Sequence, residues 1–213
     1  MGERATTYAV EPLQIYLDDA ASGKPAPGGG SVSAFVGALG AALVAMVCNL
    51  TIGKEKYADA GPRMEELVAK ADDARGRLQR LLQDDTVAYN GVIAAYRLPK
   101  DTEEQRAARA ASVQAGLIMA ADVPLDICRV AVEVCRLSKV AAEIGNPNAV
   151  TDAGIGAILG EAAAQGAALN VKINLGSIKD ADYVRRAASE IETILTETAA
   201  LRAEVLHITH DKL

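Results

Sequence analysis

Hydrophobic residues recur along most of this chain with the three-to-four-residue period of amphipathic helices. Together with cap and break signals, the pattern predicts helices from Pro12 to about Ala21, Gly61 to about Arg97, Asp101 to about Ala121, Asp122 to about Glu143, Thr151 to about Leu175 and Lys179 to Ile208. The division at Asp122 rests on Pro124, which we expect to break or kink the helix. No strand or hairpin signal interrupts the series. We therefore expect an all-α, single-domain helical bundle over residues 1–213.

A further helix is predicted from a segment without any charge. Residues 25–53 carry none, and the stretch from Val32 to Ile52 is long enough to cross a bilayer. It is rich in Gly and Ala, however, and has neither an aromatic belt nor a basic cluster on its N-terminal side. We interpret it as a long central helix buried on all sides, with Gly37 and Gly40 allowing neighbouring helices to approach closely.

Composition and charge exclude several classes of protein. Half of the 213 residues are hydrophobic but only 3% are aromatic, which predicts an aliphatic core. The net charge of −6 argues against a nucleic-acid partner, which would normally require a basic surface. Cys48, Cys128 and Cys135 lie in apolar helical patterns, and His207 and His210 lie near the C-terminus, so we expect reduced core cysteines and no metal site. No signal peptide is evident, which favours a cytoplasmic protein without membrane contact.

The segment Pro25–Ser31, PAPGGGS, is the strongest candidate for a binding loop. Its prolines stiffen the approach, and Gly28, Gly29 and Gly30 permit close contact with the backbone. We expect Ser31 to cap the central helix, whose free N–H groups attract anions or polarised oxygens. The alternative interpretation is a flexible loop with an ordinary helix cap.

Asp85 is the second candidate, because it falls within an apolar stripe of the helix predicted over residues 61–97. The stripe is formed by Leu78, Leu81, Leu82, Tyr89, Val92 and Tyr96. A carboxylate on the core-facing side costs free energy unless it is paired or used, so Asp85 either serves acid–base chemistry or bonds a structural lysine. Asp84, one position earlier, is expected to face solvent.

Several other polar residues have both a functional and a structural interpretation. Lys54 and Lys56 lie at one edge of the core, either as part of a solvated turn or as groups that bind a carboxylate. Asn170 and Asn174 share a helix face and are either satisfied structural amides or partners for a polar heterocycle. Asp152 is more typical of a helix cap than of a catalyst.

Taken together, several sequence blocks resemble the cyclodeaminase/cyclohydrolase family of folate enzymes. The blocks are PAPGGGSVSAFVGALGAALVAMVCNLTIGKEKY, the Asp84-Asp85 pair with Tyr89, LPKDTEEQRAARAASVQ, ADVPL, and GNPNAVTDAG followed by NVKINL. They occur in order over roughly residues 12–185. The resemblance implies an α-helical homodimer that binds a folate substrate and uses no metal or other cofactor.

The same resemblance implies a reaction at the one-carbon bridge of tetrahydrofolate. We expect hydrolysis of 5,10-methenyltetrahydrofolate to 10-formyltetrahydrofolate, because the formiminotransferase domain that often accompanies the cyclodeaminase is not found in this sequence. Cyclodeamination of 5-formiminotetrahydrofolate with release of ammonia is the alternative. A helical interaction module without catalysis is a third hypothesis, under which Asp85→Asn would leave folding and partner binding intact.

The resemblance also implies roles for the candidate residues. Asp85 would handle the proton, and Lys56, or else Lys54, would polarise the developing oxygen or bind the glutamate end of the substrate. The remaining residues expected at the folate are Gly28, Gly29, Gly30, Ser31, Tyr57, Asp152, Asn170 and Asn174.

Overall fold

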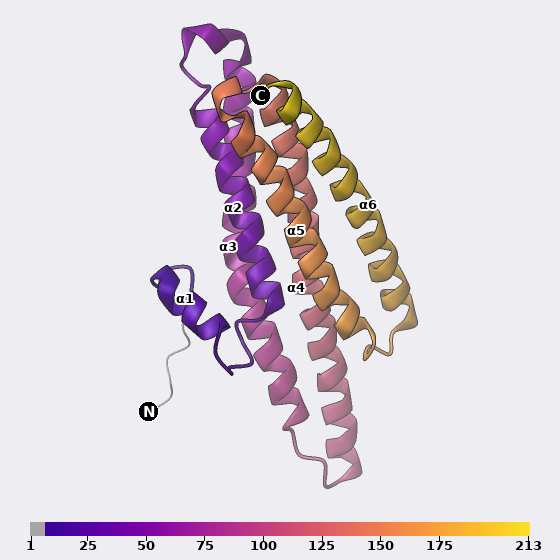
Figure 1. Ribbon diagram of the computed structural model, residues 1–213. Coiled ribbons are helices and arrows are strands. Elements are labelled where there is room, and N and C mark those ends of the chain that lie inside the picture. Colours follow the sequence, from indigo (N-terminus) through magenta and orange to yellow (C-terminus); the bar gives the residue numbers. More distant parts are fainter. Residues whose placement is uncertain (1–6) are drawn as a thin grey trace.

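Six α-helices and two short 3-10 helices make up the part of the chain that the structure describes, residues 7–213 of a computed structural model (Figure 1). The elements are α1 (Leu13–Ala20), α2 (Gly29–Asn49), η1 (Glu55–Ala60), α3 (Gly61–Tyr96), α4 (Glu103–Ile144), η2 (Pro147–Ala149), α5 (Val150–Leu175) and α6 (Ala181–Asp211). Residues 7–213 contain no strand, so the expected all-helical fold is confirmed.

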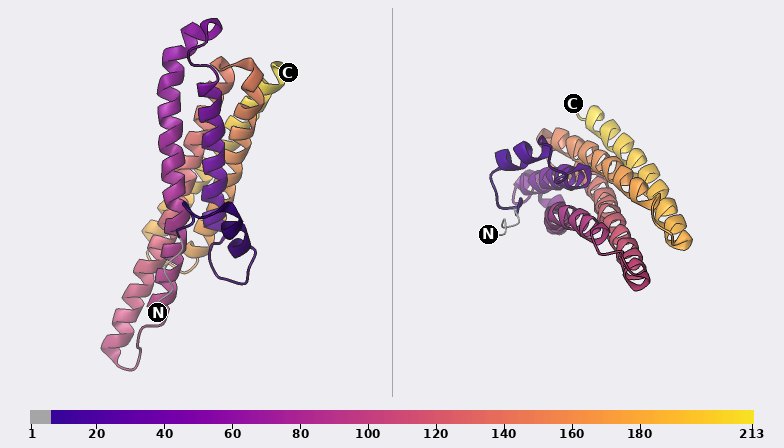
Figure 2. Two further views of the ribbon diagram at one scale, coloured as in Figure 1. Left: turned by 90° about the vertical axis from the view of Figure 1, so that its left-hand side faces the viewer. Right: turned by 90° about the horizontal axis from the view of Figure 1, so that it is seen from below.

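Helices α2, α3, α4 and α5 pack side by side as the core of the bundle, and α6 lies against α4 and α5 (Figures 1 and 2). The views in Figures 1 and 2 also show that α3 and α4 extend past the N-terminal end of α2 as a projecting hairpin. Helix α1 lies beside that same end of α2. The N-terminal end of α2 is therefore surrounded by α1, α3 and the C-terminal part of α5.

Close backbone approach in the centre of the bundle depends on small residues, as the Gly and Ala content of α2 predicts. A Cβ atom at Gly40 would lie 3.0 Å from the carbonyl oxygen of Gly156 on α5, tighter than ordinary van der Waals contact. The same position would bring it within 3.3 Å of Val134 on α4. Gly40 thus lets three helices meet at one level of the core.

The prediction that α2 is buried on all sides is only partly correct. Twelve of its 21 residues are buried, but Val32, Leu39 and Met46, which follow one another at intervals of seven, are exposed. None of the described elements covers this face. Within the described chain α2 is also the one helix long and apolar enough to cross a membrane, although 61% of its most apolar stretch is buried in the bundle. The core helix of a water-soluble protein passes the same test.

The predicted break at Pro124 is wrong, because α4 continues through it as a 42-residue helix. Proline has no N–H, so the carbonyl oxygen of Ala120 loses its intrahelical donor. The side chain of Asn174 on α5 supplies a replacement, since its Nδ2 donates to Ala120 O over 2.9 Å. A tertiary hydrogen bond therefore satisfies the group that the proline leaves unpaired, and the helix is not interrupted.

The predicted cap of α5 differs from the structure, whereas the predicted start of α4 and the predicted burial of the cysteines are confirmed. Helix α5 begins at Val150 with no side-chain cap, so Asp152 lies in its first turn rather than capping it. Helix α4 begins after Thr102, whose hydroxyl forms a capping box with Gln105. Cys48, Cys128 and Cys135 are all buried and free, as expected for core residues.

Candidate functional site

The carboxylate of Asp85 lies directly at the N-terminal end of α2. The backbone N–H of Ser31 donates to Asp85 Oδ2 over 2.9 Å, whereas Gly28, the N-cap residue, provides no side-chain cap. An aspartate from α3 therefore takes the place of a local cap and lies at the positive end of the α2 dipole. The expectation that Ser31 itself caps the helix is wrong.

Gly30 allows the carboxylate of Asp85 to lie this close to the first turn of α2. A Cβ atom at Gly30 would overlap Asp85 Oδ1, so any side chain there would force the carboxylate or the helix to move. This is the physical reason for at least one glycine in the PAPGGGS loop. It connects two sequence features, the glycine run and the aspartate in an apolar stripe, that are 55 residues apart.

The side chain of Ser31 points away from solvent and into the protein. Ser31 is fully buried, and its hydroxyl shares a 3.1 Å hydrogen bond with the hydroxyl of Tyr16, a buried residue of α1. The ring of Tyr16 packs in turn on Phe35, at 5.5 Å between centroids. Ser31 thus joins α1 to α2, and its backbone N–H, rather than its hydroxyl, reaches the functional group.

Burial changes the acid–base behaviour of Asp85. Its half-buried position raises the pKa of the carboxyl above the ordinary range, and the hydrogen bond from the Ser31 N–H opposes this only in part. Asp85 forms no salt bridge with any residue in the described range 7–213. Asp84, which precedes it, is exposed as predicted. Of the two neighbours, only Asp85 has the environment of a proton-transfer group.

Asp85 faces a cavity of about 440 Å³, a size typical of small-molecule sites. Its lining is mostly apolar, with a few polar groups that come from α2, α3, α5 and the loop after α5. The lining residues are Pro25, Ala26, Gly28, Gly29, Asp85, Tyr89, Val92, Ala120, Asn170, Ile173, Asn174 and Ser177. Gly28, Gly29, Asn170 and Asn174 are thus brought together with Asp85, as the sequence analysis expected.

The two asparagines of the cavity have structural bonds and remaining hydrogen-bonding capacity. Asn170 Nδ2 donates to Gly166 O, and Asn174 Nδ2 donates to Asn170 O and Ala120 O, each over 2.9 Å. These bonds use the amide nitrogens and hold each side chain in one orientation. The Oδ1 atoms have no donor among the described residues and can accept hydrogen bonds from a ligand.

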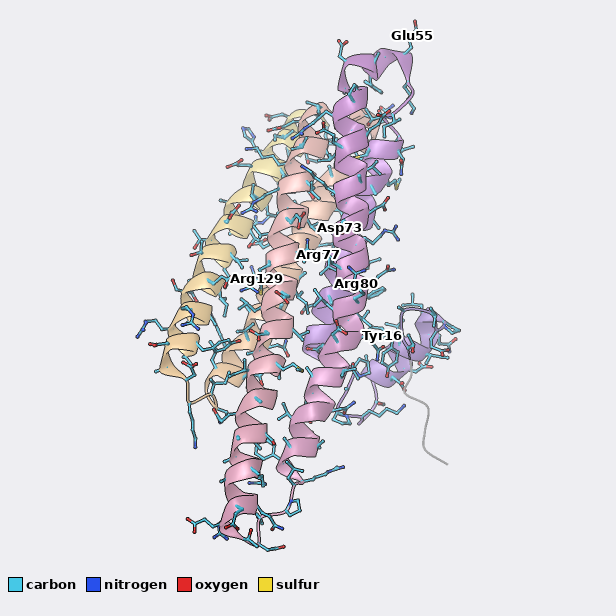
Figure 3. All side chains as sticks on the ribbon, turned by 180° about the vertical axis from the view of Figure 1, so that it is seen from behind. Tyr16, Glu55, Asp73, Arg77, Arg80 and Arg129 are labelled. Atoms are coloured by element: carbon cyan, nitrogen blue, oxygen red, sulfur yellow. The ribbon has the colours of Figure 1, made fainter. Side chains whose placement is uncertain are left out.

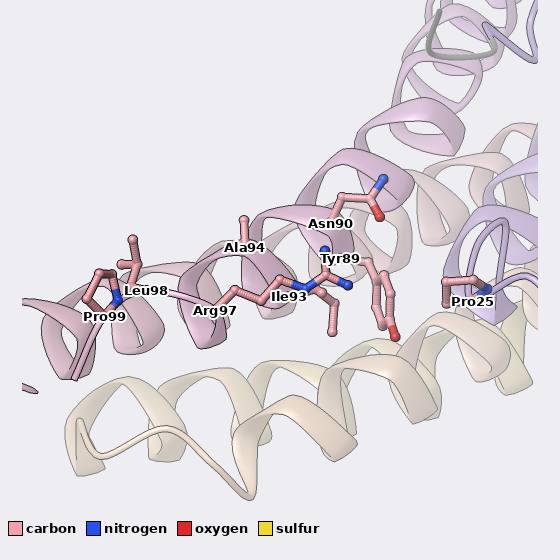
Figure 4. Close-up of a pocket in the computed structure, with 8 residues that line it drawn as sticks. All are labelled: Pro25, Tyr89, Asn90, Ile93, Ala94, Arg97, Leu98 and Pro99. Carbon is pink, nitrogen blue, oxygen red and sulfur yellow. The ribbon is translucent and has the colours of Figure 1, made fainter. Parts of the chain in front are cut away.

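A second cavity of about 590 Å³ adjoins the first along the projecting end of α3 (Figure 4). The two cavities share Pro25 and Tyr89. The other residues that line the second cavity are Asn90, Ile93, Ala94, Arg97, Leu98 and Pro99.

The remaining candidates lie at the other end of α2. Lys54, Lys56 and Tyr57 belong to η1 or the turn before it, and Asp152 lies in the adjoining first turn of α5. Figure 3 shows Glu55 of η1 at one end of the bundle and Tyr16, beside the Asp85 end, well away from it. Because α2 has 21 residues, the two groups are separated by about 30 Å at 1.5 Å per residue. Within one chain, these four residues therefore do not reach the cavity at Asp85.

Two of the cavity residues with polar side chains, Tyr89 and Ser177, were not among the predicted site residues. Tyr89 follows Asp85 by four positions on α3 and therefore shares its face, a spacing that the sequence contained. Ser177 lies in the loop after α5 and reaches the cavity only because α5 ends there. No sequence signal marks Ser177.

Comparisons with known proteins show that the chain is similar in sequence to enzymes of folate metabolism. The sequence model of the family described as Formiminotransferase-cyclodeaminase matches residues 12–193. The chain is 41% identical to a methenyltetrahydrofolate cyclohydrolase of Methylorubrum extorquens over 95% of this chain and 98% of that one. It is 32% identical to the formimidoyltransferase-cyclodeaminase of Rattus norvegicus over 91% of this chain but only 36% of that longer protein.

A solved structure agrees with the sequence comparisons. The formiminotetrahydrofolate cyclodeaminase of Thermotoga maritima superposes with a TM-score of 0.86 at 32% identity, covering 96% of this chain and 98% of that chain. The similarity therefore extends over the whole helical bundle.

Proposed function

The chain belongs to the formiminotransferase-cyclodeaminase family, and from this premise we propose that it hydrolyses 5,10-methenyltetrahydrofolate to 10-formyltetrahydrofolate. The 41% identity to a methenyltetrahydrofolate cyclohydrolase, against 32% to the cyclodeaminases of Thermotoga maritima and Rattus norvegicus, supports this reaction over cyclodeamination. The observation that carries the proposal is Asp85, a half-buried carboxylate without a salt-bridge partner in the described chain, at the edge of a mostly apolar cavity.

The chemistry of the substrate suits that carboxylate. The methenyl bridge between N5 and N10 is a delocalised cation, so a carboxylate in a poorly solvated cavity attracts it. A water molecule attacks the bridging carbon while Asp85 accepts one of its protons, which forms a C–O bond and a neutral tetrahedral adduct. Transfer of that proton to N5 accompanies cleavage of the C–N5 bond, and the formyl group remains on N10. The hydroxyl proton of the adduct is released as its oxygen becomes the formyl carbonyl.

The other cavity residues would orient the folate. The Oδ1 atoms of Asn170 and Asn174 accept hydrogen bonds from the amino and ring N–H groups of the pterin, while Tyr89 packs against its p-aminobenzoyl ring. Hydrolysis transfers no electrons and so needs no redox cofactor, and we propose no cofactor beyond the folate. We also propose a cytoplasmic site of action.

Cyclodeamination is the second candidate, favoured by the fold shared with the Thermotoga maritima enzyme. In that reaction N10 attacks the formimino carbon on N5, a C–N10 bond forms, and the C–N bond to the leaving ammonia breaks. The carboxylate of Asp85 would then accept the N10 proton and deliver a proton to the departing nitrogen.

The test is to follow the near-ultraviolet absorbance of 5,10-methenyltetrahydrofolate with the purified protein and two variants. We expect enzyme-dependent loss of absorbance, reduced at least a hundredfold in Asp85→Asn and changed less than twofold in Asp84→Asn, which alters an exposed neighbour. Circular dichroism should show all three proteins equally helical. Absence of any acceleration would overturn the hydrolase. Formation of the same absorbance from 5-formiminotetrahydrofolate, with ammonia, would identify the cyclodeaminase instead.

We also infer that two copies of the chain pair through the uncovered face of α2 and α5. Val32, Leu39 and Met46 form this face on α2, and on α5 it includes Leu169 and Ile173, which are 69% and 76% exposed. Residues 29–49 carry no charge, so a charged partner gains nothing there, whereas the same apolar face of a second copy is buried symmetrically.

Such a dimer gives the distant lysines a role. A two-fold axis across the middle of α2 places the C-terminal end of one α2 beside the N-terminal end of the other. Lys54, Lys56 and Tyr57 of one copy would then approach the cavity of the other, and Lys56 would stabilise the developing oxygen.

Mass measurement in solution and a mixing experiment test the dimer. We expect twice the 22.1 kDa of the chain, and a monomer for Leu39→Asp. Lys56→Ala should lose at least tenfold in turnover. When Lys56→Ala and Asp85→Asn are refolded together, about a quarter of the wild-type activity should return, because half the dimers then hold one intact shared site. A monomeric wild-type protein would overturn the pairing, and a dimer that shows no recovery would overturn the shared site.

A further inference from the structure

The second cavity on α3 has a chemical character that the cavity at Asp85 lacks. Among all residues that line the two cavities, Asp85 and Arg97 are the charged ones, and Arg97 lines only the second. A tetrahydrofolate carries its cationic one-carbon bridge at one end and the carboxylates of its glutamate at the other. The pair of cavities has the matching polarity, a carboxylate in one and a guanidinium in the next.

Asp85, Tyr89, Ile93 and Arg97 follow one another at intervals of four along α3, so they form one row on the helix surface. The row spans about 18 Å at 1.5 Å per residue. Tyr89 belongs to both cavities, and Figure 4 shows the side chain of Arg97 extending along α3 towards Tyr89 and Asn90. A ligand that lies along this row passes from a carboxylate, over an aromatic ring and an apolar side chain, to a cation.

The guanidinium of Arg97 also has free hydrogen-bond donors, whereas those of Arg106 and Arg109 bond to backbone carbonyl oxygens. Arg109 donates to Tyr96 O from both Nε and Nη2 at 3.1 Å, and Arg106 Nη1 donates to the carbonyl oxygens of Lys100 and Asp101. No ion pair or side-chain hydrogen bond of Arg97 occurs within residues 7–213. A planar guanidinium with free donors suits bidentate binding of a carboxylate.

We propose that the second cavity holds the glutamyl end of the folate and that Arg97 binds its carboxylate. This inference rests on the proposed function, since it takes the reacting end of the substrate to lie at Asp85. It gives to Arg97 the carboxylate-binding role that the sequence analysis considered for Lys54 and Lys56. Arg97 would contact a part of the substrate remote from the reacting carbon, and we expect it to bind the ground state and the transition state equally, which lowers KM and leaves kcat unchanged.

The experiment compares two substrates and two variants. The substrates are 5,10-methenyltetrahydrofolate and 5,10-methenyltetrahydropteroate, which lacks the glutamate. The variants are Arg97→Ala and Lys100→Ala, which remove one positive charge each, three positions apart; Lys100 does not line either cavity. We expect Arg97→Ala to raise KM for the folate by about tenfold to a hundredfold, with kcat within twofold. With the pteroate, Arg97→Ala and the wild type should have the same KM, and Lys100→Ala should behave as wild type with both.

Three results would overturn the inference while leaving the proposed function in place. They are an unchanged KM in Arg97→Ala, an equal rise in KM for folate and pteroate, and an equal effect of Lys100→Ala. If the wild type turns over neither substrate, the proposed function fails, and equilibrium binding still decides the role of Arg97. The probes are then 5-formyltetrahydrofolate and 5-formyltetrahydropteroate. Arg97→Ala must weaken only the first by tenfold or more, and any other outcome overturns the inference.

Discussion

The two ends of α2 use their polar side chains in opposite ways. At the C-terminal end, Asn146 links the chain to itself: its backbone N–H donates to Thr51 Oγ1, its Nδ2 donates to Leu50 O, and its Oδ1 accepts from Tyr57 Oη. At the N-terminal end, Asp85 receives one protein hydrogen bond, from the Ser31 N–H, and faces a cavity.

The C-terminal end of α2 is a closed junction, because the polar groups of Asn146 are bonded within the protein. The N-terminal end is an open site, because Asp85 has one protein partner and faces a cavity. Polar groups that are fully paired within the protein stabilise it and have little capacity left for a ligand. A half-buried carboxylate with one partner costs stability, and that cost is typical of functional groups. Substitutions at the two ends should therefore differ in kind, one affecting turnover and the other the free energy of unfolding.

The largest effect should come from Gly30→Ala. The new Cβ overlaps Asp85 Oδ1, so the carboxylate is displaced from the N-terminal end of α2. We expect kcat/KM to fall at least a hundredfold and the free energy of unfolding to fall by about 1–3 kcal/mol. Gly91→Ala on exposed α3, where a Cβ would meet nothing within 4 Å, is the matched control and should be neutral or slightly stabilising. Equal losses in both variants would contradict the role of Gly30.

A smaller effect, on stability, should follow from Asn146→Ala at the other end. The substitution leaves Leu50 O without its side-chain donor and removes the acceptor of the Tyr57 hydroxyl. We expect denaturant unfolding to show a loss of about 2 kcal/mol. Asn148→Ala is the control, because Asn148 contributes only its backbone N–H to this cluster and keeps it after substitution. If the two variants unfold at the same denaturant concentration, the side-chain hydrogen bonds of Asn146 do not stabilise this end of α2.

The smallest effect should be a difference in pH dependence. The pKa of Asp85 is raised by burial, so its carboxylate becomes protonated at a pH above the ordinary aspartate value of about 3.9. As the base it must be ionised, and kcat/KM should fall as pH decreases through this raised pKa. The residual activity of Asp85→Asn should lack that acid limb. A midpoint at or below the ordinary value would show that Asp85 is not the group that titrates.

The same group makes a stability prediction with a definite sign. A raised pKa means that the folded protein favours the protonated form of Asp85, so its contribution to stability is greatest at low pH and declines as pH rises through the folded pKa. Asp85→Asn, which is neutral at every pH, should therefore gain in unfolding free energy relative to wild type as pH increases. Denaturant unfolding of both proteins across the acid range measures this.

Much of the fold was predictable because it depends on local chemistry. The helical period and the cap and break signals are properties of neighbouring residues, and α3, α5 and α6 begin and end close to the predicted bounds. The continuity of α4 through Pro124 was not predictable. It depends on Asn174, which lies 50 residues later in the sequence and reaches Ala120 O only in the folded bundle.

The candidate site divides in the same manner. The glycine loop, Asp85, Asn170 and Asn174 could be selected as candidates from the sequence, because a charge in an apolar stripe, a glycine run and paired amides are unusual within their own segments. Their arrangement depends on tertiary packing: these four features surround one cavity, Ser31 bonds to Tyr16, and Lys54, Lys56 and Asp152 lie about 30 Å away in the same chain. The physical reason is that residue type and period determine which face of a helix a side chain occupies. The helix that the face meets depends on packing between segments far apart in the sequence.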